Sequence, residues 1–191
     1  MRPVRGICAI ARAAIAILCL TALTASARAI TLIERGAGAA ELRGRFETGD
    51  EKLFERFLAQ PRAQKIRVLW LHSPGGILSS GLAIGRMVRR AGIVTAVDAG
   101  SAYCDSACTL VFVAGARRHY VRADDLQEGQ SSLTGLGFHG SFTRGNALNP
   151  AMRSDAGTQQ MIAFYRSMGS PGAVDLMRRA RRLRGRRPRV R

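Results

Sequence analysis

The chain has 191 residues, of which 47% are apolar, which is enough for one domain with a hydrophobic core and too little for two. Its formal net charge is +17 at pH 7, but four basic residues lie within residues 1–29 and nine within residues 178–191. Residues 30–177 therefore carry only about +4, and the overall charge gives no argument that the folded part binds nucleic acid.

Residues 1–29 have the pattern of a signal peptide. Three arginines near the start precede a largely apolar stretch at residues 13–23, and Ala27-Arg28-Ala29 offers an A-x-A cleavage site. The apolar stretch is too short for a stable membrane-spanning helix. We therefore expect an exported chain, periplasmic or secreted, whose mature form begins at Ile30. An uncleaved interfacial anchor is the alternative, because arginines interrupt both the apolar run and the cleavage site.

The next segments predict a hairpin and a helix. Residues 30–34 and 41–46 have the mixed apolar character of short strands around a glycine turn. Thr48-Gly49-Asp50-Glu51 matches a capping box, and apolar residues follow it at helical spacing as far as Pro61. Residues 66–71 then predict a mostly buried strand that leads into a glycine turn.

That glycine turn, Ser73-Pro74-Gly75-Gly76, begins a βαβ unit. The pattern predicts an amphipathic helix at residues 78–90 and a strand at residues 93–97. A second unit begins where Val97 leads through Gly100 towards Ser106. Right-handed crossovers place both turns at one edge of a parallel sheet, where ligands bind. Beyond them we expect a strand at residues 119–121, a glycine-rich loop at 126–137, a helix at 151–168 and a last helix from Pro171.

Three motifs supply the parts that nucleophilic acyl transfer requires: a hydroxyl, a base, and backbone donors for the developing oxyanion. Ser106 lies at the predicted beginning of an apolar helix, where free N–H groups favour negative charge. Gly75 and Gly76 allow the backbone to approach a substrate closely. His139 is flanked by glycines. The alternative is that Ser106 only caps its helix and His139 is an ordinary loop residue.

Together these motifs resemble the Clp protease/crotonase-like superfamily. The matching residues are Ser73-Pro74-Gly75-Gly76 after a strand, Ser106 with Ala114-Gly115 eight residues further on, and His139. More narrowly, they are similar to the predicted periplasmic Clp-protease-like bacterial proteins that place a serine between two cysteines. The match is well defined over residues 66–140.

The resemblance implies a single α/β domain, at residues 30–177, built as a spiral of βαβ units. It implies that Ser106 attacks the carbonyl of a peptide or acyl substrate and that His139 accepts its proton. The N–H groups of Gly76 and Ala107 would hold the oxyanion, and Ser73, Pro74 and Gly75 would shape the substrate turn. No cofactor or metal is expected, and relatives with this fold often form homo-oligomers.

The chain departs from the family at the acid that orients the histidine. The family's aspartate position falls among residues 184–188, which contain no acid. Asp155 or Asp175 could substitute for it, a backbone carbonyl could steady His139, or the C-terminal end has lost part of the domain. An acid that only orients the base contributes about 10⁴ in rate. The alternative function is therefore a catalytically inactive protein that binds acyl or carboxylate ligands.

Cys104 and Cys108 are the two cysteines that remain once the signal peptide is removed. On a helical turn their Cα atoms would lie about 6 Å apart, within the range for a disulfide. An oxidising compartment favours that bond, and we expect it to pin the nucleophile turn. Metal binding and thiol chemistry are the weaker alternatives, because two local cysteines with this spacing do not make a zinc site.

Residues 178–191 form an arginine-rich tail, for which we expect disorder. An exposed tail of this kind would contact anionic surfaces such as lipid headgroups or an acidic partner. It contains no aromatic residues that could stack on bases, so specific nucleic-acid binding is not expected. A tail that only adds solubility, or a terminus altered by a change of reading frame, is the alternative.

Overall fold

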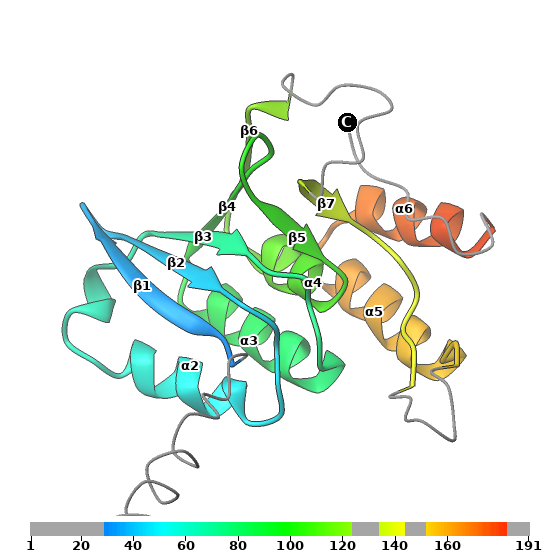
Figure 1. The fold of residues 1–191 in the computed structure, drawn as a ribbon, viewed down its shortest axis with the longest axis horizontal. Helices are drawn as coiled ribbons and strands as arrows, with labels where there is room; N and C mark the ends of the chain where they lie inside the picture. The colour runs from blue at the N-terminus through cyan, green and yellow to red at the C-terminus, as the bar shows by residue number, and fades with distance from the viewer. Residues whose placement is uncertain (1–28, 124–133, 144–151, 183–191) are drawn as a thin grey trace, which may run out of the picture.

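The fold is built on a five-stranded, mostly parallel sheet (Figure 1). The computed structural model describes residues 29–123, 134–143 and 152–182. The first two strands form an antiparallel hairpin, and the other three continue the sheet in parallel. In their order across the sheet the strands are β1 (Thr31–Gly36), β2 (Ala39–Arg43), β3 (Val68–His72), β4 (Val94–Asp98) and β6 (Arg118–Val121).

The predicted helices are all present, and α2 and α3 lie against one face of the sheet (Figure 1). Buried residues alternate along β3, where Leu69 and Leu71 are buried while Trp70 on the other face is half-buried. A single turn of 3₁₀ helix, η2 (Ala63–Lys65), precedes β3. The α-helices are α2 (Asp50–Leu58), α3 (Leu78–Arg90), α4 (Ala107–Ala114), α5 (Asp155–Ser167) and α6 (Pro171–Arg182).

A second, two-stranded sheet was not predicted. β5 (Tyr103–Asp105) pairs in parallel with β7 (Gly135–Gly137). We expected β4 to lead to the serine without a further strand, and the residues of β7 to be loop. β5 also pairs with the residue that follows β3, because Ser73 and Cys104 form an isolated parallel bridge. Residues 126–133 of the predicted loop lie outside the described residues, as does residue 151 of the helix predicted at residues 151–168.

The predicted capping box at the start of α2 is wrong. The N-cap residue is Gly49, with a φ of 95° and no side-chain cap. The Glu51 carboxylate accepts the hydroxyl of Ser80 on α3 at 2.7 Å in addition to a backbone N–H at Gly49. Because glycine has no side chain, the reciprocal bond of a capping box is missing. Asp50 supplies the local carboxylate, since its Oδ2 accepts the N–H of Glu47 at 2.7 Å. Asp50 therefore links the start of α2 to the segment that precedes it.

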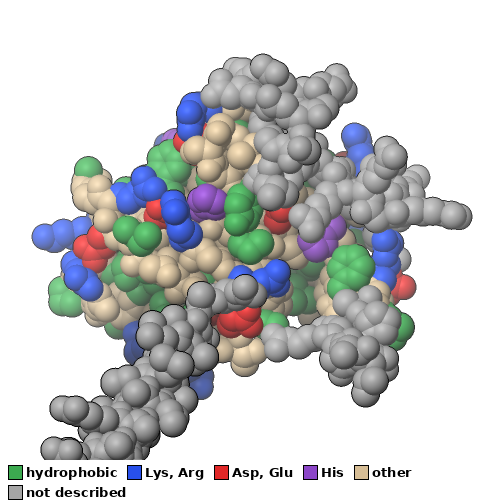
Figure 2. Space-filling model, viewed as in Figure 1, with side chains coloured by type: hydrophobic (Ala, Val, Ile, Leu, Met, Phe, Trp, Pro, Cys, Tyr) green, Lys and Arg blue, Asp and Glu red, His purple; other side chains and the backbone are tan. Residues whose placement is uncertain are grey.

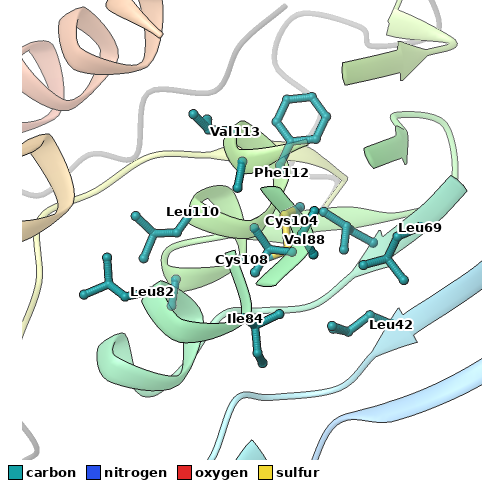
Figure 3. Packing of buried hydrophobic residues seen from close by; sticks show 14 of the residues in the cluster. Leu42, Leu69, Leu82, Ile84, Val88, Cys104, Cys108, Leu110, Phe112 and Val113 are labelled. Atoms are coloured by element: carbon teal, nitrogen blue, oxygen red, sulfur yellow. A yellow bond between two sulfur atoms is a disulfide. The ribbon is translucent and has the colours of Figure 1, made fainter. Parts of the chain in front are cut away.

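Helices α3 and α4 pack closely because glycines of α3 face α4. A Cβ on Gly81 would lie 2.8 Å from the carbonyl oxygen of Ala107, and one on Gly85 would lie 3.2 Å from that of Leu110. Every residue of α4 is buried. In Figure 3 the Cys104–Cys108 bond lies among apolar side chains such as Val88 and Ile84 of α3. The start of α4 is thus fixed deep in the core.

Outside this core the visible face carries basic and acidic side chains in mixture, without one large patch of a single sign (Figure 2). Helix α6 runs to Arg182 and so continues into the arginine-rich segment that we predicted as a tail. Residues 183–191 and 1–28 lie outside the described residues. Among the helices that the structure describes, none has the length and apolar character needed to cross a membrane.

Candidate active site

Ser106 occupies a tight turn between a strand and a helix. It follows β5 directly and stands at the N-cap position of α4. Its backbone has φ 55° and ψ −123°, a positive φ that non-glycine residues rarely adopt. Such a conformation persists only where the surroundings hold it, and strand-to-helix turns of this kind present a serine for nucleophilic attack. The sequence prediction that Ser106 begins a helix is confirmed.

Hydrogen bonds hold this turn on both sides of the serine. The N–H of Ser106 donates to the carbonyl of Gly137 at 2.9 Å. The carbonyl of Ser106 accepts from the N–H of Thr109 at 3.0 Å and from the Thr109 hydroxyl at 2.5 Å. Both of its peptide groups therefore have fixed partners, while the side chain is half-buried.

The predicted disulfide is present and encloses the turn. Cys104 of β5 is bonded to Cys108 of α4, with a Cα–Cα distance of 5.2 Å. Both cysteines are fully buried. A covalent link across the serine restricts how far the strand and the helix can separate.

The glycine turn after β3 packs directly on the nucleophile turn. A Cβ on Gly75 would lie 2.4 Å from the carbonyl oxygen of Asp105 and 2.7 Å from both the amide nitrogen of Ala107 and the Cβ of Ser106. Only glycine fits at this distance, and the φ of 79° at Gly75 also favours it. The buried Ser73 hydroxyl accepts the N–H of Gly75 at 3.0 Å, which makes it a turn-shaping group.

Two backbone N–H groups are available beside Ser106. Ala107 is the first residue of α4, so its N–H has no acceptor within the helix. Phe46 bonds to the residues on either side of Gly76, accepting from Ile77 and donating to Gly75, each at 2.8 Å. These two bonds make Phe46 and Gly76 an isolated parallel bridge, in which the N–H of the middle residue points away from the partner. The Gly76 amide therefore faces away from Phe46, and both Gly76 and Ala107 line a cavity with Ser106.

This cavity has a volume of about 370 Å³ and brings the candidate groups together. It contains Ser106, the two candidate donor residues, Pro74 and His139 in its wall. Ser73 and Gly75 are not part of the wall and act from behind it. Apolar and polar side chains share the remaining surface, namely Arg45, Phe46, Glu47, Ile77, Leu78, Ser141, Phe142, Thr143 and Met161.

His139 is half-buried, and its ring is oriented by a backbone carbonyl. The Nδ1 atom lies 2.8 Å from the carbonyl oxygen of Gly140. Because a carbonyl can only accept a hydrogen bond, Nδ1 carries the proton, and the neutral imidazole then has its lone pair on Nε2. The ring also contacts that of Phe142, with centroids 5.8 Å apart. This tautomer leaves Nε2 able to act as a base.

The two acids considered for orienting His139 are both exposed to solvent. Asp175 of α6 is exposed and pairs with Arg178 at 3.5 Å. Asp155, the first residue of α5, is also exposed. Of the alternatives left open by the sequence, the backbone carbonyl is the one seen at Nδ1.

The residues that hold the Ser106 turn and the His139 segment in place were not predicted from the sequence. Thr109 binds the Ser106 carbonyl, and its Oγ1 lies 2.6 Å from the hydroxyl of Tyr165 on α5. Thr158 of α5 accepts the N–H of Ser141 at 2.9 Å. Gly137 is required because a Cβ there would lie 1.9 Å from a carboxylate oxygen of Asp105. Only the glycine carried a visible signal in the sequence.

Comparison with known proteins supports the fold. The chain matches the 1510-N membrane-bound stomatin-specific protease in a serine-to-alanine mutant (TM-score 0.50, 15% identity, 69% of this chain and 60% of that chain). It also matches a lysine-to-alanine mutant of that protease in complex with a substrate peptide (TM-score 0.50, 16% identity, 68% and 57% of the two chains). The matches thus span less than two thirds of those proteins. No family model and no curated protein matches the chain.

At this identity the likeness shows the fold alone. The chain has a mixed α/β fold of the Clp-protease type, as the sequence predicted.

Proposed function

We propose that the protein is an exported serine hydrolase of the peptidase type, with Ser106 as nucleophile and His139 as base. The observation that carries the proposal is the strained backbone of Ser106 at the start of α4, in one cavity with His139 and two backbone donors. Strain of this kind is costly and is found mostly where function needs it. A serine that only capped the helix would require no positive φ and would accept a backbone N–H, whereas the Ser106 side chain makes no such bond.

In the proposed reaction, the Oγ of Ser106 attacks the carbonyl carbon of a peptide or acyl substrate, and its proton passes to Nε2 of His139. The carbonyl oxygen becomes an oxyanion bound by the N–H groups of Gly76 and Ala107. When the tetrahedral intermediate collapses, the bond to the leaving group breaks and His139 returns its proton to that group. Water then attacks the acyl-enzyme by the same route and restores the serine hydroxyl.

We expect a slow enzyme. The Gly140 carbonyl fixes the ring and its tautomer but carries only a partial charge, so it stabilises the imidazolium less than a carboxylate does. Loss of the orienting acid costs up to about 10⁴ in rate, while backbone donors and binding retain about 10³ to 10⁴ over water. Measurable acylation of Ser106 with slow turnover is the expected behaviour.

The proposed location is the periplasm or the cell exterior. The buried disulfide supports it, because such bonds persist in oxidising compartments. The proposed substrate is a peptide or another acyl compound, and apolar wall residues such as Ile77 and Phe142 favour an apolar group beside the reacting carbonyl.

Labelling with a fluorophosphonate tests the proposal. The purified, folded chain should take one label, mapped by mass spectrometry to Ser106, and the label should be absent from Ser106→Ala and slowed at least 100-fold in His139→Ala, a typical loss for a general base. His119 lies outside this cavity wall, so His119→Ala should leave the rate unchanged and serves as the control. Folded protein that takes no label would exclude the hydrolase and support the inactive, ligand-binding alternative.

A further inference from the structure

Helix α5 contacts the segment that carries His139 on both sides of the histidine. The Thr158 hydroxyl accepts the N–H of Ser141 at 2.9 Å and donates to the Ser154 carbonyl at 2.8 Å. The carbonyl of Ser141 in turn accepts the N–H of Ser154 at 2.8 Å. On the other side of the histidine, the ring of Phe138 packs edge-on against Tyr165, with centroids 5.9 Å apart.

The same helix contacts the nucleophile turn through a chain of two hydroxyls. The carbonyl of Ser106 can only accept, so the single hydroxyl proton of Thr109 points to it, at 2.5 Å. The hydroxyl of Tyr165 must then donate to Thr109 Oγ1, at 2.6 Å. Burial of the Tyr165 ring raises the pKa of its hydroxyl, which keeps the group protonated as a donor.

Thr158 and Tyr165 are seven residues apart, two helical turns, and so lie on one face of α5. Both are almost completely buried. We propose that this face of α5 positions the base, His139, relative to the nucleophile, Ser106. Thr158 and Tyr165 are its positioning residues. The proposal rests on the proposed hydrolase, in which His139 is the base.

The test measures the rate of Ser106 labelling by a fluorophosphonate, across pH, in variants that remove one hydroxyl each. Tyr165→Phe, Thr109→Val and Thr158→Val should each slow labelling by about 10²-fold, the cost of a misplaced catalytic group. Thr109→Ser and Thr158→Ser keep the hydroxyl and should label at nearly the wild-type rate. Tyr165→Phe combined with Thr109→Val should cost no more than Thr109→Val alone, because both break one chain.

Thr95→Val is the matched control. The buried Thr95 hydroxyl donates to the carbonyl of Phe112 at 2.7 Å, so it also binds a carbonyl of α4, but at the helix end remote from Ser106. This variant should lose thermal stability as the others do and label at the wild-type rate. The control separates a positioning effect from a general loss of stability.

The outcomes distinguish failure of the proposed hydrolase from failure of the positioning role of α5 alone. Wild-type protein that takes no label overturns the proposed function and this inference with it. Wild-type protein that labels, with Tyr165→Phe and Thr158→Val labelling equally fast, overturns the inference alone. If the valine variants do not fold, Tyr165→Phe and the serine variants decide: serine variants that lose as much rate as Tyr165→Phe exclude the hydroxyls as the cause.

An independent observation concerns Ile30, the residue before β1. Its backbone nitrogen donates to Oδ2 of Asp50 at 3.3 Å within the protein interior. The side chains of both residues are buried, whereas Ala29 is exposed. The same Asp50 oxygen accepts the N–H of Glu47 at 2.7 Å. Glu47 and Phe46, which we call the strap, both line the cavity, and Phe46 is hydrogen-bonded to Gly75 and Ile77.

We infer that cleavage after Ala29 places the new α-ammonium group of Ile30 against Asp50, where it forms a buried ion pair that anchors this strap. The inference rests on the proposed export. Before cleavage the contact is one amide hydrogen bond, and after cleavage a full charge faces the carboxylate at the same place, which makes the bond stronger. The buried Ile30 side chain keeps the new terminus in position.

The test expresses the whole chain with its own leader, determines the amino-terminal residue by sequencing, and compares melting midpoints. One alanine inserted between Ala29 and Ile30 moves the ammonium group away, and it should lower the midpoint by about 5 to 10 °C. Asp50→Asn should do the same, and the two changes combined should add little. A mature chain that begins elsewhere, or an insertion that leaves the midpoint unchanged, overturns the inference. The midpoint requires no catalysis, so this result stands apart from the hydrolase test.

Discussion

Replacing Gly75 by alanine tests whether the glycine turn and the nucleophile turn are packed as one unit. The added Cβ would lie 2.4 Å from the carbonyl oxygen of Asp105 and 2.7 Å from the amide nitrogen of Ala107. These atoms belong to the backbone, so they cannot move aside as a flexible side chain would. The strand end or the start of α4 has to shift.

The cost has two parts. A positive φ of 79° costs an alanine about 1 to 2 kcal/mol relative to glycine. Overpacking against fixed neighbours adds about 1 to 3 kcal/mol. The expected loss for Gly75→Ala is therefore about 2 to 5 kcal/mol in the free energy of unfolding, a large share of the stability of an ordinary domain.

Gly169→Ala provides the matched control. Gly169 has a similar φ of 68°, but a Cβ there would have no neighbour within 4 Å, so the variant carries only the backbone cost. Urea unfolding of both variants isolates the packing contribution, and fluorophosphonate labelling shows whether Ser106 has moved. Equal destabilisation of the two variants, with wild-type labelling in Gly75→Ala, would refute the close packing of the two turns.

Two other properties can be checked directly. Replacing both Cys104 and Cys108 by serine should cost about 2 kcal/mol of stability, the value for closing so short a loop; protein isolated without reductant that shows two alkylatable thiols would contradict the bond. Burial, and secondarily the charge of Arg43, hold the pKa of His72 below its ordinary value of 6.5. The unfolded chain therefore binds this proton more readily, so stability from neutral His72 is present above about pH 6.5 and falls as the pH drops towards the lower folded pKa. Unfolding in urea at pH 7.5 and 5.0 should show that His72→Gln loses less free energy of unfolding at the lower pH than wild type does. Identical losses in the two proteins would count against this assignment.

The sequence predicted those parts of the fold that show in local patterns. The helix at residues 78–90 was predicted with the bounds of α3, because its apolar residues recur at helical spacing and a strand and a glycine flank it. β3 and β4 were each displaced by one or two residues. β5 and β7 were missed, since three residues are too few to display the alternation of a strand.

In the site, too, the residues that could be predicted are those that lie in local motifs. Ser106, Gly76, Ala107 and His139 were named from motifs, and they share one cavity wall. Thr109 and Tyr165 could not be found, because their contact joins residues 56 positions apart and each looks like an ordinary core residue in its own helix. The capping box failed because the helix begins one residue later than the pattern indicated, at a glycine N-cap that has no side chain to accept a helical N–H.

A crystal structure of the fluorophosphonate adduct would show directly which groups react and which groups bind the oxyanion. We predict a phosphorus atom bonded to the Oγ of Ser106, with its oxygen about 2.7 to 3.1 Å from the amide nitrogens of both Gly76 and Ala107. The ring of His139 should face the adduct through Nε2, with Nδ1 still bonded to the Gly140 carbonyl. An adduct on another residue, or an oxygen turned away from both amides, would contradict the assignment of this cavity as a hydrolase site.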